Sequence, residues 1–134
     1  MSDSPKYSVT LGDKDVDALI EALPLAALYS GRYAPTLLER FLVSGEAANR
    51  KLALHSGDFS QEELQIIGLS VMIAIGLLKG EIQPFVDIEE FRALAEYSDT
   101  YIRLAPMFEK MLNETLGSGS QIETLGGPHI ERIC

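Results

Sequence analysis

The segment at 64–78 constrains the fold of this chain more than any other part of its sequence. It reads LQIIGLSVMIAIGLL, in which only Gln65 and Ser70 are polar. A helix that is apolar on every side must be enclosed, either by other protein segments or by a lipid bilayer. The run is about 15 residues long, whereas a helix that crosses a bilayer needs roughly 20, and no basic residues cluster beside it. We therefore expect a helix enclosed by other helices, and no contact with a membrane.

The residues on either side of this segment mark the ends of a helix. Ser60 and Glu63 stand at the spacing of a capping box, in which each side chain accepts a hydrogen bond from the other residue's backbone N–H. Lys79 and Gly80 follow the last apolar residue, and glycine often ends a helix. The many β-branched residues leave buried strands as an alternative, but the capping box and the length of the segment favour a helix.

Apolar residues at spacings of three and four predict further helices on both sides of the apolar segment. We expect these helices at 14–23, 25–29, 35–42, 46–55 and 87–116. Ser44 and Gly45 are expected to separate the third helix from the fourth. Asp87 is the expected N-cap of the last helix, and Pro106 is expected to kink that helix or divide it in two.

The two ends of the chain differ from its middle. Tyr7, Val9 and Leu11 alternate with polar residues, which predicts either one short strand or an extended arm. The last residues are rich in glycine and serine with isolated apolar side chains, a composition typical of a flexible tail. The predicted organisation is an N-terminal arm at 1–12, a helical domain at 13–116 and a flexible C-terminal tail at 117–134.

These patterns predict an all-α fold, a compact helical bundle of about five to six helices around the central apolar helix at 64–78. One short N-terminal strand is compatible with it. A chain of 134 residues can bury one hydrophobic core, and 46% hydrophobic with 23% charged residues is the balance of a globular protein. The chain is therefore expected to fold without a partner.

Charge and cysteine content limit the classes of function. The net charge of −9 and the isoelectric point near 4.6 argue against direct nucleic-acid binding, because phosphate contacts need clustered Lys and Arg. Cys134 is the only cysteine, so no internal disulfide is possible. The first residues lack a basic region followed by an apolar run, as a secretory signal requires. We expect a cytoplasmic protein.

Motifs for metals and catalysis are incomplete in this sequence. Asp13, Asp15 and Asp17 have the first spacing of a calcium loop, but Ala18 and Pro24 stand where such a loop needs glycine and glutamate. The C-terminal His-x-Glu-x-x-Cys lacks the second paired cysteine of a deaminase-type zinc site. No glycine-rich phosphate motif or nucleophile elbow is present. We expect no metal and no cofactor, and no catalytic residue can be assigned.

Acidic residues are concentrated in the second half of the helical region. Residues 58–99 hold nine acidic and two basic residues, whereas residues 22–57 hold four basic and two acidic residues. This asymmetry either orients self-association, attracts a basic partner, or simply keeps the protein soluble. The candidate partner-binding surface consists of Glu81, Asp87, Glu89, Glu90 and Glu96.

Three functional hypotheses follow from these observations. The first is a non-catalytic protein–protein interaction module, an adaptor, assembly factor or regulator, that forms a homodimer and binds a possibly basic protein. Its basis is the excess of apolar helix surface, which two chains can bury together. The second is a small helical enzyme or ligand-binding domain with a pocket lined by Tyr97, Tyr101 and Met107. The third is an acidic mimic of nucleic acid.

Overall fold

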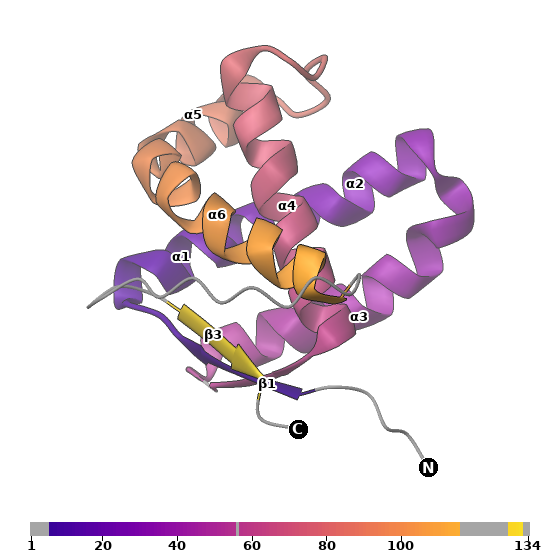
Figure 1. The fold of residues 1–134 in the computed structure, drawn as a ribbon. Helices are drawn as coiled ribbons and strands as arrows, with labels where there is room; N and C mark the ends of the chain where they lie inside the picture. The colour runs from indigo at the N-terminus through magenta and orange to yellow at the C-terminus, as the bar shows by residue number, and fades with distance from the viewer. Residues whose placement is uncertain (1–5, 56, 116–128, 133–134) are drawn as a thin grey trace.

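The computed structural model describes residues 6–55, 57–115 and 129–132, which contain six α-helices and three short strands (Figure 1). In chain order the elements are β1 (Lys6–Thr10), α1 (Asp13–Ala22), α2 (Pro24–Tyr33), the 3-10 turn η1 (Pro35–Leu37), α3 (Leu38–Ala53), β2 (Asp58–Ser60), α4 (Gln61–Lys79), α5 (Ile88–Glu96), α6 (Ser98–Thr115) and β3 (His129–Arg132). The predicted fold class is confirmed: the protein is an all-α bundle around the apolar helix, with an N-terminal strand.

α4, the predicted apolar helix, lies at the centre of the bundle and contacts all five other α-helices. The predicted capping box begins it, because Ser60 Oγ accepts from the Glu63 N–H and the Glu63 carboxylate accepts from the Ser60 N–H. Gly80 ends it at φ 77°, a left-handed conformation that strains any residue with a side chain. Ser70 is buried, and its hydroxyl donates to two backbone carbonyls at 2.8 and 3.2 Å.

Close packing around α4 depends on its small residues. A Cβ atom added at Gly68 would lie 3.2 Å from Phe108 Cβ, so the glycine lets α6 approach α4. In the described part of the chain, α4 is also the one helix whose length and composition would suffice to cross a membrane. The other helices bury 61% of its most apolar window, as the core helix of a globular bundle requires.

Several helix boundaries differ from the predicted ones, and α2 (Pro24–Tyr33) runs past the predicted end at residue 29. α3 continues through Ser44 and Gly45, because Ser44 and Ala48 on either side of the glycine are buried and hold the helix against the core. The predicted helix at 87–116 does divide, but at Tyr97 and not at Pro106, which lies inside α6. The Tyr97 N–H donates to the Leu94 carbonyl in a tight turn, so α5 and α6 run in different directions.

The strands form a three-stranded antiparallel sheet in the order β2, β1, β3. Tyr7 and Val9 of β1 are buried and face the core, as their alternation with polar residues predicted. His129–Arg132 were placed in the predicted flexible tail, but they pair with β1 as β3. The backbone N–H and C=O groups of β1 pair with those of β3, and the amino-acid composition of a segment does not predict such pairing. The rest of the predicted tail, 117–128 and 133–134, lies outside the described residues.

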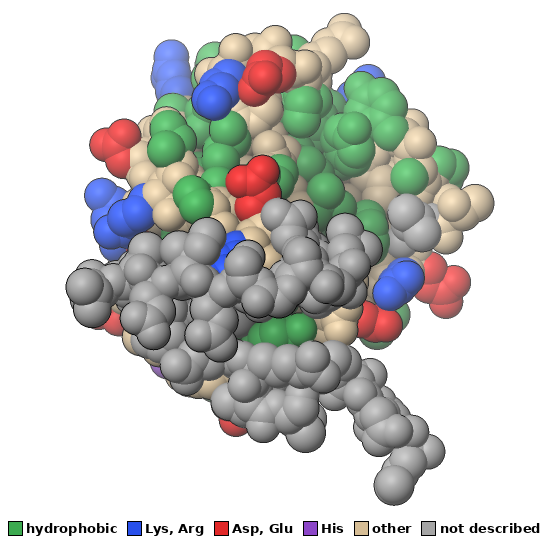
Figure 2. Space-filling view, in the orientation of Figure 1, with side chains coloured by type: hydrophobic (Ala, Val, Ile, Leu, Met, Phe, Trp, Pro, Cys, Tyr) green, Lys and Arg blue, Asp and Glu red, His purple; other side chains and the backbone are tan. Residues whose placement is uncertain are grey.

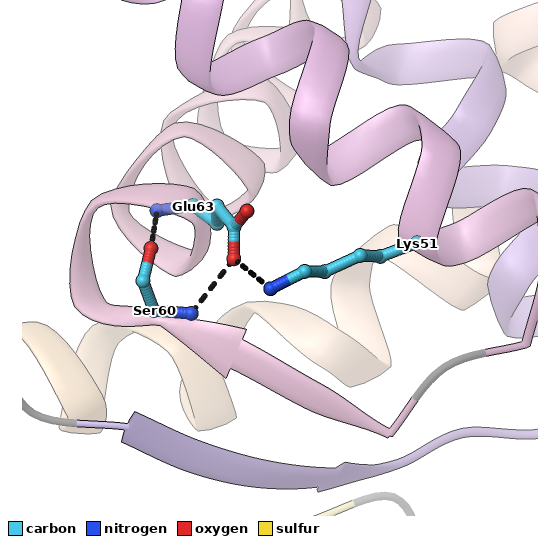
Figure 3. A network of polar contacts seen from close by, with 3 residues as sticks. All are labelled: Lys51, Ser60 and Glu63. Atoms are coloured by element: carbon cyan, nitrogen blue, oxygen red, sulfur yellow. Dashed lines mark hydrogen bonds and ion pairs between the residues drawn. The ribbon is translucent and has the colours of Figure 1, made fainter.

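Two acidic side chains tie the elements together through polar contacts. The Glu63 carboxylate accepts from Lys51 Nζ at 2.7 Å as well as from Ser60, which joins α3, β2 and α4 (Figure 3). Asp15 is buried, accepts from the Gly12 N–H and forms an ion pair with Arg103 of α6. Asp15 therefore caps α1 and anchors α6, a structural role for a residue of the incomplete calcium motif.

Candidate interaction surface

The five acidic residues of the predicted partner-binding surface lie on α5 and on the loop before it. Glu81, Asp87, Glu89 and Glu96 are exposed, and Glu90 is half-buried. Asp87 is the N-cap of α5, since its carboxylate accepts from the Glu90 N–H at 2.8 Å. Among the described residues, none of the five forms a salt bridge. We refer to this group as the acidic surface.

The pKa of Glu90 is raised by burial and by neighbouring carboxylates. Burial raises this pKa above its usual value of 4.5, and the nearby carboxylates of Glu21 and Asp87 raise it further. Like charges that lack a cation between them favour the protonated form of a carboxyl group. A basic group from outside the described fold would therefore be favoured at this place.

The residues of the predicted ligand pocket belong largely to the core. Tyr101 is fully buried, and its hydroxyl donates to the Ala18 carbonyl oxygen at 2.8 Å. The ring of Tyr97 packs against it with centroids 6.3 Å apart, and Met107 is half-buried against the core. Burial also raises the pKa of Tyr101 far above its usual value. Its hydroxyl is engaged within the protein, so it offers no surface-accessible ligand contact.

A second candidate interaction surface lies along α4. Most of this helix is buried, but Gln65, Leu69, Met72 and Ile75 are only half-buried. They follow one another at spacings of three and four, so they form one strip along the helix. We call these four residues the α4 stripe. Apolar side chains fill three of its four positions, and Figure 2 shows hydrophobic side chains gathered where α4 lies between α6 and α2.

Two hollows adjoin the α4 stripe, one beside each half of the helix. The larger hollow, of about 360 Å³, is lined by Arg40, Phe41, Glu62, Gln65, Ile66, Leu69 and Met72, which come from α3 and α4. The smaller, of about 70 Å³, is lined by Ile75, Leu78, Lys79, Ser98 and Ile102, which come from α4 and α6. Ile102 at its rim is 53% exposed. The stripe is therefore continuous with apolar side chains of two neighbouring helices.

Charged residues stand at the two ends of the α4 stripe. Glu62 lies before it, where Arg40 Nη2 contacts Glu62 Oε1 at 3.2 Å with both side chains 57% exposed. Lys79 lies after it and is exposed. The stripe thus has an acidic end and a basic end, with apolar side chains between them.

Sequence reasoning passed over this surface although a signal for it was present. Steps of three or four residues from Glu62 reach Gln65, Leu69, Met72, Ile75 and Lys79. The exposed polar residues Glu62 and Lys79 and the half-buried Gln65 therefore lie along this strip, which marks it as the part of the helix nearest water, whereas the polar Glu63 and Ser70 are buried. The contributions of Phe41 and Ile102 depend on how α3 and α6 pack, and no local pattern reveals them.

The described residues contain no group of three or more His, Cys, Asp or Glu side chains arranged to hold a metal ion. Comparison with models of protein families, with curated proteins and with solved structures finds no match to this chain.

Proposed function

We propose that this protein is a non-catalytic protein–protein interaction module, an adaptor, assembly factor or regulator, whose contact surface is the α4 stripe with its two hollows. The observation that carries this proposal is the row of Leu69, Met72 and Ile75 on the central helix, which its neighbours bury only in part. Apolar surface that gathers in one place and has charged residues at its margin is typical of sites where proteins bind one another.

The composition of the larger hollow supports binding to a protein surface. Its interior is lined mainly by apolar side chains, and its charged members, Arg40 and Glu62, pair with each other. Such a hollow accepts an apolar side chain from a partner, while the exposed charges around it orient the contact.

The acidic surface supports a second contact, with a basic protein. Its carboxylates form no salt bridge within the described residues, and burial together with the charges of Glu21 and Asp87 raises the pKa of Glu90. A Lys-rich or Arg-rich partner surface would relieve the repulsion between these charges. Binding of this kind weakens as ionic strength rises, because salt screens exposed charges.

Site-specific photo-crosslinking in cells that make the protein tests the proposal. A photoreactive residue replaces Met72 in one variant and the exposed Glu46 of α3 in the control. We expect a protein adduct from position 72, with either a second copy or another protein, and none from position 46. Equal adduct formation from both positions, or none from position 72, would refute the proposal.

A further inference from the structure

We propose that the α4 stripe binds the α4 stripe of a second copy of this chain, in an antiparallel two-fold dimer that brings Glu62 of each copy to Lys79 of the other. This inference rests on the proposed function and names the partner of the same surface. The observation that carries it is the order of charged and apolar side chains along the stripe.

The stripe is complementary to its own reverse. Glu62 and Lys79 lie 17 residues apart, which is about 25 Å along a helix. An antiparallel copy centred between positions 70 and 71 places Glu62 opposite Lys79 at both ends. The same operation places Leu69 opposite Met72, so the apolar side chains meet at the centre. A two-fold interface requires this kind of self-complementarity, because each contact occurs twice.

Ion pairing at the ends agrees with the contacts already present. Arg40 contacts Oε1 of Glu62, which leaves Oε2 for the ammonium group of Lys79 from the second copy. A parallel arrangement would instead place Glu62 against Glu62 and Lys79 against Lys79. Repulsion between like charges disfavours that arrangement, so the charges select the antiparallel one.

The hollows adjoin opposite halves of α4, and they differ in size. The larger lies beside Leu69 and Met72, and the smaller lies beside Ile75 with the exposed Ile102 at its rim. A two-fold axis at right angles to α4 keeps the α3 side of one copy on the same flank as the α3 side of the other. In the antiparallel dimer, the larger hollow of each copy therefore adjoins the α3 flank of the interface, and Ile102 of α6 adjoins the other flank.

The first test is the mass of the full chain in solution. Size-exclusion chromatography with light scattering at micromolar concentration is expected to give twice the chain mass of 14.7 kDa. Met72→Glu places two carboxylates near the centre of the interface and is expected to weaken the dimer by about 100-fold. Leu54→Glu makes the same type of change at a residue that is 73% exposed and lies beyond the end of α3, and it should leave the dimer unchanged.

Charge reversal tests the antiparallel arrangement. Glu62→Lys alone and Lys79→Glu alone each create like-charge contacts at both ends of the dimer, and each is expected to weaken it by about tenfold. An equimolar mixture of the two variants restores opposite charges at both ends and should recover dimer. Glu46→Lys is the matched control, because it breaks the exposed Glu46–Arg50 pair away from the stripe. Circular dichroism checks that every variant is folded.

Each result decides the inference. A dimer that Met72→Glu and the two charge reversals weaken, and that the mixture restores, supports it. A monomeric wild-type chain overturns it, and so does a mixture that stays monomeric. Crosslinking from position 72 to a different protein, together with a monomeric wild type, would overturn this inference and leave the proposed function standing.

Discussion

Glu63 offers the sharpest test of how the central helix is held in place, because one carboxylate serves two contacts that can be separated. Its Oε1 accepts from the Ser60 N–H and from Lys51 Nζ, both at 2.7 Å, and its side chain is 9% exposed. The contact with Ser60 completes the capping box of α4. The contact with Lys51 connects α4 to α3 (Figure 3).

The two contacts are expected to contribute differently to the free energy of unfolding. Loss of the carboxylate leaves the Ser60 N–H without its partner at the start of a central helix, which costs about 1–3 kcal/mol. Loss of the ion pair costs only about 0.5–1 kcal/mol, because the Lys51 side chain is 36% exposed and water can solvate its ammonium group. Glu63→Ala removes both contacts and is expected to lower the free energy of unfolding by about 2–3 kcal/mol.

Glu63→Gln separates the two contributions. The amide oxygen of glutamine can still accept from the Ser60 N–H, whereas the charge that attracts Lys51 is lost. We expect this variant to lose about 1 kcal/mol, and Lys51→Met to lose a similar amount with its cation–π contact to Phe59. The double variant should lose less than the sum of the two, because the second substitution finds the ion pair already broken.

Urea unfolding followed by circular dichroism measures these differences, provided that the dependence on urea concentration stays the same for all variants. Glu63→Gln as destabilising as Glu63→Ala would refute the reasoning, since the ion pair and not the capping box would then be the main contribution. Additive effects of Glu63→Gln and Lys51→Met would refute the direct contact between the two side chains.

Three further predictions concern the core, the acidic surface and the central helix. Tyr101→Phe removes the buried hydroxyl that donates to Ala18 and should cost about 1 kcal/mol in urea unfolding, with no change in helix content. Burial and the charge of Glu21 raise the pKa of Glu90 in the folded state, so its contribution to stability is present at low pH and is lost as pH rises through that pKa. Glu90→Gln should therefore stabilise the protein at neutral pH, and unfolding curves should show the gain vanish below about pH 4. Backbone amides in the middle of α4 should exchange with deuterium more slowly than those of α5, and rapid exchange throughout α4 would contradict its central position.

The fold was predictable where local patterns and packing agree. A helix that is apolar on every side must be buried by other segments, so the central position of α4 could be predicted from the sequence. Ser60 and Asp87 were identified as caps because capping depends on residues only three positions apart. The N-terminal strand was indicated by the alternation of Tyr7 and Val9.

The predictions failed where a tertiary contact outweighs a local preference. Glycine lowers helix propensity, but α3 continues through Gly45 because burial of the neighbouring Ser44 and Ala48 compensates for it. Pro106 lies inside α6 and does not divide it, and the break comes instead at Tyr97. The strand β3 pairs with residues from the other end of the chain, and such pairing is invisible to any short window.

The candidate surface was missed for a related reason. Sequence reasoning treated α4 as covered on every side. It therefore attributed self-association to surplus apolar surface on the other helices, and it assigned a basic partner to the acidic residues. Five helices contact α4, yet Leu69, Met72 and Ile75 remain half-exposed. Exposure of single residues depends on where each neighbouring helix crosses, which periodicity does not specify.

The residues of α4 differ in how strictly the core requires them to be apolar. Leu64 and Val71 are fully buried, and the core requires them to be apolar. Leu69, Met72 and Ile75 are only partly buried, so a polar residue at one of these positions would cost the isolated chain less than at Leu64 or Val71. Gln65, on the same strip, shows that α4 accommodates a polar side chain at such a position. Packing against the core accounts for the buried part of Leu69 and Ile75, and association with another protein surface is the role that we propose for the part of the stripe that stays exposed.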